Sequence, residues 1–179
     1  MKQETILAQA VIETERMILR PVRMSDAGLV HMYASDKRVA ENTANIPHPF
    51  PPGAAEAYLQ RCMKPERTEF VWAMDATDRG GAELMGLISM EQLDRDQSEI
   101  GYWVAPAMWN TGFASEAVHA LVEANPLENK TIFASVFQGN PSSARVLTNA
   151  GFDYLGDAEA FSVARNAKVP TWTYLKRLI

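Results

Sequence analysis

Six residues between an expected strand and an expected helix could bind a phosphate through their backbone. The sequence WNTGFA, residues 109–114, places a glycine and an alanine where the helix begins. The amides of a first helical turn have no partner inside the helix, and the helix dipole adds partial positive charge. Because Gly112 and Ala114 leave these amides open to close approach, the loop suits a phosphate or pyrophosphate without any lysine.

The elements around this loop follow from its flanks. β-Forming residues cluster over Glu99–Val104, and Pro106 removes a backbone donor, so a strand is expected to end there. Helical spacing of apolar residues then predicts a helix that begins near Gly112. The apolar face of that helix consists of Ala114, Ala117, Val118, Leu121 and Val122. Strand, glycine and helix also describe ordinary α/β connections, and the sequence contains neither G-x-G-x-x-G nor a P-loop.

A second pattern lies in QGNPSSARVLTNAGF, after a further expected strand at Thr131–Phe137. Asn140 can cap a helix that has Pro141 at its first position, and Gly151 can end it. Ser143 shares the inward face with the apolar residues of this helix, so its hydroxyl needs a partner. That partner could be a helix carbonyl, as for many serines, or a bound ligand.

Both patterns resemble motifs of the GNAT superfamily of N-acetyltransferases. Trp109–Ala114 is similar to the Q/R-x-x-G-x-G/A pyrophosphate loop, and GYWVAP followed by W-x-x-G-F-A-S-E-A resembles the branch typified by ribosomal-protein alanine acetyltransferases, where Trp commonly replaces Gln or Arg. The N-x-x-S of Asn140 and Ser143, followed by V-L-x-x-x-G-F, is similar to the second GNAT motif. The usual glycine after the Trp is Asn110 here, a residue that tolerates positive φ better than most.

The resemblance extends over nearly the whole chain, from TERxxLRP near the start to ARNAKVPTWTYLKR near the end. It implies a single α+β domain over residues 1–179 with the GNAT fold, a mixed sheet of about seven strands and about four helices. It also implies acetyl-CoA as co-substrate and direct transfer to a primary amine. The cofactor-binding residues that it implies are Tyr102, Trp103, Val104, Trp109, Asn110, Thr111, Gly112, Phe113, Ala114, Asn140 and Ser143.

In GNAT proteins the strand that carries Tyr102–Val104 splays away from its neighbour, which frees main-chain groups for the pantetheine arm and the thioester oxygen. The resemblance implies that Asn140 bonds the pantetheine amide. Many GNAT enzymes place a tyrosine acid at the position of Leu147. The ribosomal-protein branch instead implies Ser143 as the catalytic proton donor to the leaving thiolate.

A catalytic base is also required, because an alkyl ammonium is almost wholly protonated at neutral pH. The base must be a carboxylate or a water held by one. Glu99, on the motif strand, is the first choice, and Glu91, on the preceding strand, is the second. A carboxylate at a solvated strand end explains either residue equally well.

Composition favours a soluble globular protein. The chain has 179 residues, 47% of them hydrophobic and 22% charged, with a net charge of -5. This balance provides no basic field for nucleic acid or an anionic membrane, and no apolar run approaches the ~18 residues of a membrane span. Cys62 is the single cysteine, which fits a reducing compartment, and no secretion signal is evident, so we expect a cytoplasmic protein. His31, His48 and His119 show no metal spacing, so no metal is expected.

The other elements are predicted from caps, turns and periodicity. Ser25 and Asp26 begin a helix expected to bury Leu29, Val30, Met32 and Tyr33. Pro52 precedes a second helix, at 54–63. Three extended runs, at 70–74, 84–93 and 99–104, form an antiparallel meander, and the motif helix crosses over to a parallel strand at 131–137. The remaining segments are a lead-in at 1–10, a first strand at 17–22, a hairpin at 157–163 and a terminal strand at 171–179.

The acceptor is the least legible part of the chain. The proline-rich segment 45–53 corresponds to the acceptor wall of GNAT proteins, so His48, Phe50 or Tyr58 could contact substrate, although loop packing explains each of them. Few unpaired acidic residues can be assigned to this side. The resemblance favours a protein α-amino group, and a small amine, an amino acid or an amine antibiotic is the alternative. A catalytically silent acyl-CoA-binding module, a structural protein without cofactor, and either a monomer or a homodimer also stay open.

Overall fold

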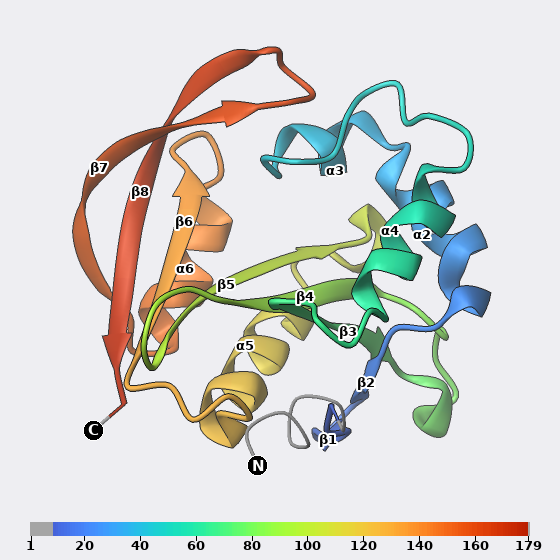
Figure 1. Cartoon of the computed structure of the whole chain (residues 1–179), viewed down its shortest axis with the longest axis horizontal. Coiled ribbons are helices and arrows are strands. Elements are labelled where there is room, and N and C mark those ends of the chain that lie inside the picture. Colours follow the sequence, from blue (N-terminus) through green and yellow to red (C-terminus); the bar gives the residue numbers. More distant parts are fainter. Residues whose placement is uncertain (1–8, 179) are drawn as a thin grey trace.

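The computed structural model describes residues 9–178, so most of the expected lead-in lies outside the described residues. Eight strands form one sheet in the order β1-β2-β3-β4-β5-β6-β8-β7 (Figure 1). The strands are β1 (Ile12–Glu13), β2 (Ile18–Pro21), β3 (Glu69–Asp75), β4 (Gly86–Gln92), β5 (Gln97–Val104), β6 (Thr131–Phe137), β7 (Asp153–Ser162) and β8 (Ala167–Arg177). The α-helices are α2 (Ala27–Ala34), α3 (Lys37–Glu41), α4 (Ala54–Cys62), α5 (Phe113–Ala124) and α6 (Pro141–Asn149).

The sheet is mixed, as the sequence predicts. Neighbouring strands from β1 to β5 are antiparallel; short connections join β1 to β2, β3 to β4 and β4 to β5, whereas α2, α3 and α4 lie between β2 and β3. β5 and β6 are parallel, because α5 carries the chain across one face of the sheet between them. β8 pairs antiparallel with both β6 and β7 and completes the sheet.

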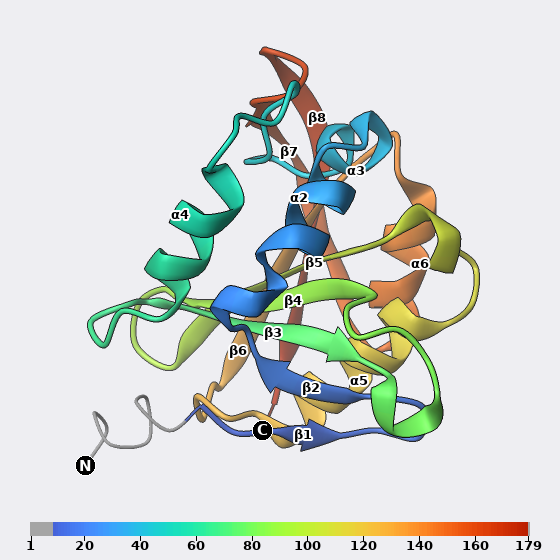
Figure 2. The ribbon, with the colours of Figure 1, turned by 90° about the vertical axis from the view of Figure 1, so that its right-hand side faces the viewer.

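Helices cover both faces of the sheet (Figure 2), with α5 and α6 on one side and α2 and α4 on the other. The alternation in β3 serves both layers, since Phe70, Trp72 and Met74 join the core under α5 while Val71 and Ala73 join the core under α2 and α4. All five side chains are at most 1% exposed. The central strands are therefore buried on both faces.

The expected α+β fold with a mixed sheet is confirmed. About seven strands and four helices were expected, and the described residues form eight strands and five α-helices, because β1 and α3 are too short to show a period in the sequence. Two details need correction. Met32 is 54% exposed and does not belong to the buried stripe of α2, which consists of Val30 and Ala34. The last hairpin starts at Asp153 rather than at residue 157, since β7 pairs with β8 from Asp153 to Ser162.

Candidate active site

The loop after β5 leaves several backbone amides unpaired. The turn Pro106–Met108 leads to Trp109, whose indole Nε1 donates to the last carbonyl of β5 at 2.7 Å. Asn110 and Gly112 take positive φ values of 62° and 85°. Among the described residues, the amides of Asn110, Thr111 and Gly112 donate to no protein acceptor, and the first-turn amides of α5 have no partner within the helix. Free donors therefore gather at the positive end of a helix.

These donors border a cleft of about 390 Å³ formed by the loop, β5 and α6. Every residue expected to bind the cofactor lines it except Thr111. The side chain of Thr111 donates to the Met108 carbonyl, and its own carbonyl accepts from Arg16 Nη1 at 2.9 Å. The expected residues that line the cleft are Tyr102, Trp103, Val104, Trp109, Asn110, Gly112, Phe113, Ala114, Asn140 and Ser143.

Two further walls of the cleft were missed by the sequence reasoning. Ser142, Arg145 and Asn149 line it from α6, and Val39 and Asn42 line it from α3 and its end. Within the α6 set, Arg145 and Asn149 follow Ser142 at i+3 and i+7, so the helix period contained this signal. The α3 set had no local signal, because its approach to the cleft is purely tertiary.

The parallel pair of strands separates inside the site. β5 and β6 are paired only from Gln97 with Thr131 to Glu99 with Phe133, although both strands continue beyond these residues. On its other edge β5 stays paired with β4 as far as Val104. Figure 1 shows β6 turning away from β5 at this point. Main-chain groups on one edge of residues 100–104 therefore lack a strand partner and face the opening between the two strands.

Tyr102 on β5 and Ser143 on α6 bridge this opening. The Ser143 hydroxyl donates to Tyr102 Oη at 2.8 Å, and the Tyr102 hydroxyl donates to the Ser143 carbonyl at 3.0 Å. Burial raises the pKa of Tyr102 to about 12, although the bond from Ser143 opposes the shift. Tyr102 therefore stays protonated at neutral pH. Leu147, at the position where many GNAT enzymes have tyrosine, is fully buried in the core.

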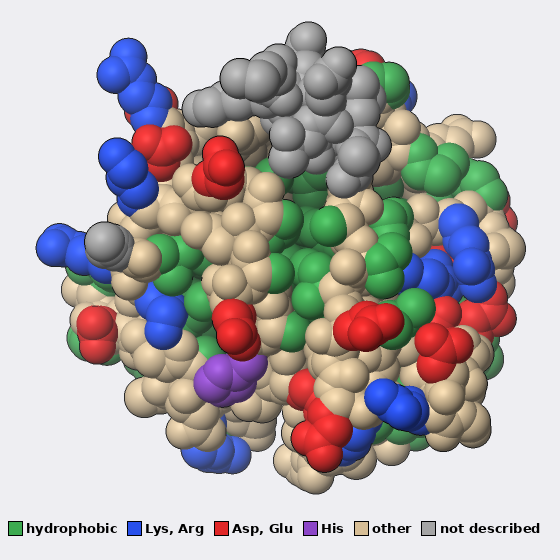
Figure 3. Space-filling model, turned by 90° about the horizontal axis from the view of Figure 1, so that it is seen from below, with side chains coloured by type: hydrophobic (Ala, Val, Ile, Leu, Met, Phe, Trp, Pro, Cys, Tyr) green, Lys and Arg blue, Asp and Glu red, His purple; other side chains and the backbone are tan. Residues whose placement is uncertain are grey.

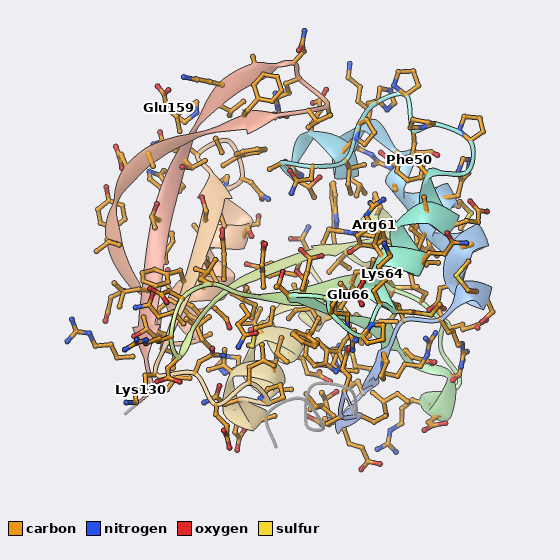
Figure 4. All side chains as sticks on the ribbon, in the orientation of Figure 1. Phe50, Arg61, Lys64, Glu66, Lys130 and Glu159 are labelled. Carbon is orange, nitrogen blue, oxygen red and sulfur yellow. The ribbon has the colours of Figure 1, made fainter. Side chains whose placement is uncertain are left out.

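A second, larger cavity of about 970 Å³ lies on the α4 side of β5. It shares Asn42, Tyr102 and Trp103 with the first cleft, so the two spaces meet at β5. Phe50 and Tyr58 line it, whereas His48 does not. Phe50 precedes α4 in the chain. Three charged residues that also line the cavity lie around the C-terminal end of α4 (Figure 4): Arg61, Lys64 and Glu66.

Three carboxylates from successive strands line this second cavity. Glu69 is the register partner of Glu91, and Glu91 is the register partner of Glu99, so the three residues form one row across β3, β4 and β5. Among the described residues, neither Glu91 nor Glu99 forms a hydrogen bond or an ion pair. Sequence reasoning missed Glu69, because only strand register places it beside Glu91.

The pKa values of two carboxylates in this row, Glu69 and Glu99, are raised. Burial, and then the charge of Glu91, raises the pKa of Glu99. The same two causes raise the pKa of Glu69, against a hydrogen bond with Tyr58 that lowers it. Glu99 therefore combines partial burial, a like-charged neighbour and a position next to the opening of β5, which is the environment of a general base.

No His, Cys, Asp and Glu cluster of three or more is arranged to hold a metal within residues 9–178. None of the helices in that range is long and apolar enough to cross a membrane. Figure 3 shows the face that includes α5, on which acidic and basic side chains are interspersed and no continuous basic band forms among the described atoms.

The chain is similar in sequence and in fold to known acetyltransferases. The family model "Acetyltransferase (GNAT) domain" matches residues 16–153. An uncharacterized N-acetyltransferase of Bacillus subtilis, YoaA, is 30% identical over 155 residues, which cover 82% of this chain and 84% of that protein.

Two solved structures share the fold at low sequence identity. RimL, a ribosomal L7/L12 alpha-N-protein acetyltransferase in complex with coenzyme A, superposes with a TM-score of 0.79 at 15% identity and covers 94% of this chain and 98% of its own. Spermidine N-acetyltransferase from Vibrio cholerae, in complex with CoA and spermine, superposes with a TM-score of 0.73 at 17% identity. The match covers 89% of this chain and 95% of that protein's chain. With the family match over most of its length, this chain belongs to the GNAT family of acetyltransferases.

Proposed function

We propose that this protein transfers the acetyl group of acetyl-CoA directly to a primary amine, with the α-amino group of a protein N-terminus as the first candidate acceptor. The observation that carries the proposal is the cleft between β5 and α6, where unpaired amides, a splayed strand edge and Ser143 meet. The fold shared with RimL supports the choice of acceptor.

The residues present fit a CoA molecule. The free amides of the loop and of the first turn of α5 suit the pyrophosphate, because they combine unsatisfied donors with the positive helix end. Asn140, which makes no side-chain cap bond to α6, keeps its amide for the pantetheine arm. The unpaired edge of Tyr102–Val104 offers main-chain donors and acceptors to the arm and the thioester. When bound, acetyl-CoA supplies the activated acetyl group.

Glu99 removes the proton from the acceptor ammonium, directly or through a water. The free amine then forms a bond to the thioester carbon and its nitrogen gives up a second proton to water, while the C–S bond breaks and the sulfur leaves with its electron pair. Glu91 serves as the neighbouring charge that raises the pKa of Glu99, which makes the carboxylate a stronger base. Glu91 itself is the second candidate for the base, one strand further from the opening.

Ser143 donates a proton to the departing thiolate. Its hydroxyl is held at 2.8 Å from Tyr102 Oη, on the side of α6 that faces the strand opening. Tyr102 keeps its own proton, which its hydroxyl donates to the Ser143 carbonyl at 3.0 Å. Tyr102 therefore positions Ser143, and Ser143 takes its replacement proton from solvent.

A second candidate acceptor is a small amine with more than one positive charge. The row of Glu69, Glu91 and Glu99 favours it, because three adjacent carboxylates attract a cation more strongly than one. A structural neighbour from Vibrio cholerae is a spermidine N-acetyltransferase in complex with spermine. The larger cavity, at about 970 Å³, has room for either a peptide end or a small amine.

Calorimetric titration with acetyl-CoA, with CoA and ATP as comparisons, tests the cofactor first. We expect micromolar binding of acetyl-CoA and CoA and none of ATP. Thiol release with a panel of peptides that begin with Ala or Ser, spermidine and single amino acids then identifies the acceptor. Binding without turnover of any amine would favour a silent acyl-CoA-binding module, and absence of CoA binding would overturn the proposal.

We further propose a cytoplasmic protein of one domain, either monomeric or homodimeric. Cys62, the single cysteine of the sequence, is buried and free, which fits a reducing compartment. Size-exclusion chromatography with light scattering would distinguish the monomer from the dimer.

A further inference from the structure

Arg16 lies behind the amide-rich loop, although the two are far apart in the sequence. It belongs to the tight turn between β1 and β2, where the amide of Thr14 donates to the Met17 carbonyl at 2.9 Å. The guanidinium Nη1 donates to the Thr111 carbonyl at 2.9 Å. The guanidinium carbon also lies 4.1 Å from the centre of the Phe113 ring. The Arg16 guanidinium therefore contacts a backbone carbonyl of the loop, at Thr111, and a side chain next to it, the Phe113 ring.

Glu116, in the first turn of α5, holds Arg16 in this place. Glu116 Oε1 accepts from Arg16 Nε at 2.7 Å, and Oε2 accepts from the Arg16 amide at 2.9 Å. The Thr14 hydroxyl donates to the same Oε2 at 2.5 Å. The carboxyl of Glu116 is 17% exposed. Three donors from one turn thus fix this carboxylate, and the carboxylate fixes the guanidinium.

The bond to Thr111 determines which way one anion-binding amide points. A trans peptide unit is planar, so the Thr111 carbonyl and the Gly112 amide hydrogen point in opposite directions. Arg16 binds the carbonyl from behind the loop, and the Gly112 amide therefore faces the cleft that Gly112 lines. Gly112, with φ of 85°, has no Cβ to resist a flip of this peptide unit. The restraint must come from elsewhere, and Arg16 provides it.

We propose that Arg16, anchored by Glu116, is a positioning residue that keeps the loop amides directed at the CoA pyrophosphate. This inference rests on the proposed function. It predicts that Arg16 matters for the part of the ligand that carries the pyrophosphate and not for the pantetheine arm, which the Tyr102–Val104 edge and Asn140 would bind.

The test compares CoA with pantetheine, which lacks the pyrophosphate. For Arg16→Ala we expect the Kd of CoA, measured by calorimetry, to rise about tenfold, since a hydrogen bond to a charged group and the orientation of one donor are lost. The Kd of pantetheine, measured by NMR titration, should change by less than about twofold. Arg16→Lys should lie between wild type and alanine, because lysine cannot bond Glu116 and Thr111 together in Arg geometry. The lysine variant also serves if alanine fails to fold.

Arg23→Ala is the matched control, because Arg23 forms an exposed ion pair with Glu83 at 2.9 Å and borders neither cavity. It should leave both dissociation constants unchanged. An unchanged Kd of CoA in both Arg16 variants would overturn the inference, and so would an equal loss for CoA and pantetheine, which marks a general structural role. Failure of the wild-type protein to bind CoA would instead contradict the proposed function.

Discussion

The two halves of the candidate site are built from different parts of the chain. The cofactor side consists mainly of backbone: amides of residues 110–115 and one edge of β5. The acceptor side consists of side chains that three strands, α4 and a proline-rich loop bring together. The cofactor side should therefore depend on backbone conformation and tolerate changes of side chain, whereas the acceptor side should depend on single carboxylates.

Glu99→Gln tests the acceptor side most severely. The substitution keeps the shape of the side chain and removes the base, so we expect turnover to fall by about 100-fold or more while CoA affinity stays within about twofold. Steady-state kinetics and calorimetry would measure the two quantities. A variant with near-normal turnover would shift the role of base to Glu91 or to a bound water.

The same variant should be more stable at neutral pH. The folded-state pKa of Glu99 is raised, so between the unfolded and folded pKa values the folded state binds more protons. Stability is then lost as the pH rises through that window. Because glutamine removes this penalty, the melting temperature at pH 7 should increase, and a decrease would contradict the raised pKa.

Gly112→Val tests the cofactor side through its backbone. Gly112 has φ of 85°, where a β-branched residue is strongly disfavoured, and a Cβ there would lie 3.2 Å from Arg16 Nη2. We expect CoA affinity to fall by about 100-fold, as the loop must change conformation. Gly80→Val is the control, since Gly80 has φ of 74° with open space around it. Equal CoA affinity in the two variants would show that the loop does not hold the pyrophosphate.

The contrast between the two sides also explains what could be predicted from the sequence. The loop at 109–114 and the pair Asn140 and Ser143 are contiguous motifs, and their local geometry follows from glycine, proline and helix-cap chemistry. The same holds for α5 and α6, which are long enough for the helical repeat of their apolar residues to be recognised in the sequence. Most of the cofactor side could therefore be predicted from individual segments of the sequence.

The composition of the acceptor side could not be predicted from the sequence, because its residues come together only in the folded sheet. Glu69 joins Glu91 and Glu99 through strand register, which a shift of one residue would destroy. On the cofactor side, Arg16 was missed for the same reason, because it reaches the loop from the turn between β1 and β2, far away in the sequence. The splay of β5 from β6, also on the cofactor side, was expected from the family resemblance alone, because it depends on where strand pairing stops. β1 and α3 are too short to leave a periodic signal.

Ser143→Ala should produce a smaller effect than either substitution above. We expect turnover to fall about tenfold with little change in CoA affinity, because water can replace the donor. The turnover of Tyr102→Phe should fall by less than that of Ser143→Ala. The double variant should have the same turnover as Ser143→Ala, since Tyr102 acts through Ser143. Thr148→Val, which removes a hydroxyl that bonds only the Ala144 carbonyl at 2.7 Å, is the control. Additive losses would separate the two residues.

Glu91→Gln should change a pH profile more than a rate. Its charge helps to raise the pKa of Glu99, so a neutral glutamine should move the acid limb of turnover to lower pH. The window of pH over which stability falls should narrow for the same reason. Glu123→Gln, at an exposed site on α5, should leave the limb in place. A limb that stays fixed in the Glu91 variant would remove Glu99 as the titrating group.

Substitutions at Asn110 should have the smallest effect where they preserve the backbone. Asn110 holds φ at 62°, the conformation for which the related motif uses glycine, so Asn110→Gly should keep the Kd of CoA within about twofold. Asn110→Val must pay about 1–2 kcal/mol for the left-handed conformation, and the Kd should rise about tenfold. If glycine weakened binding as much as valine, the asparagine side chain itself would contact the ligand. The cofactor side would then depend on a side chain, as the acceptor side does.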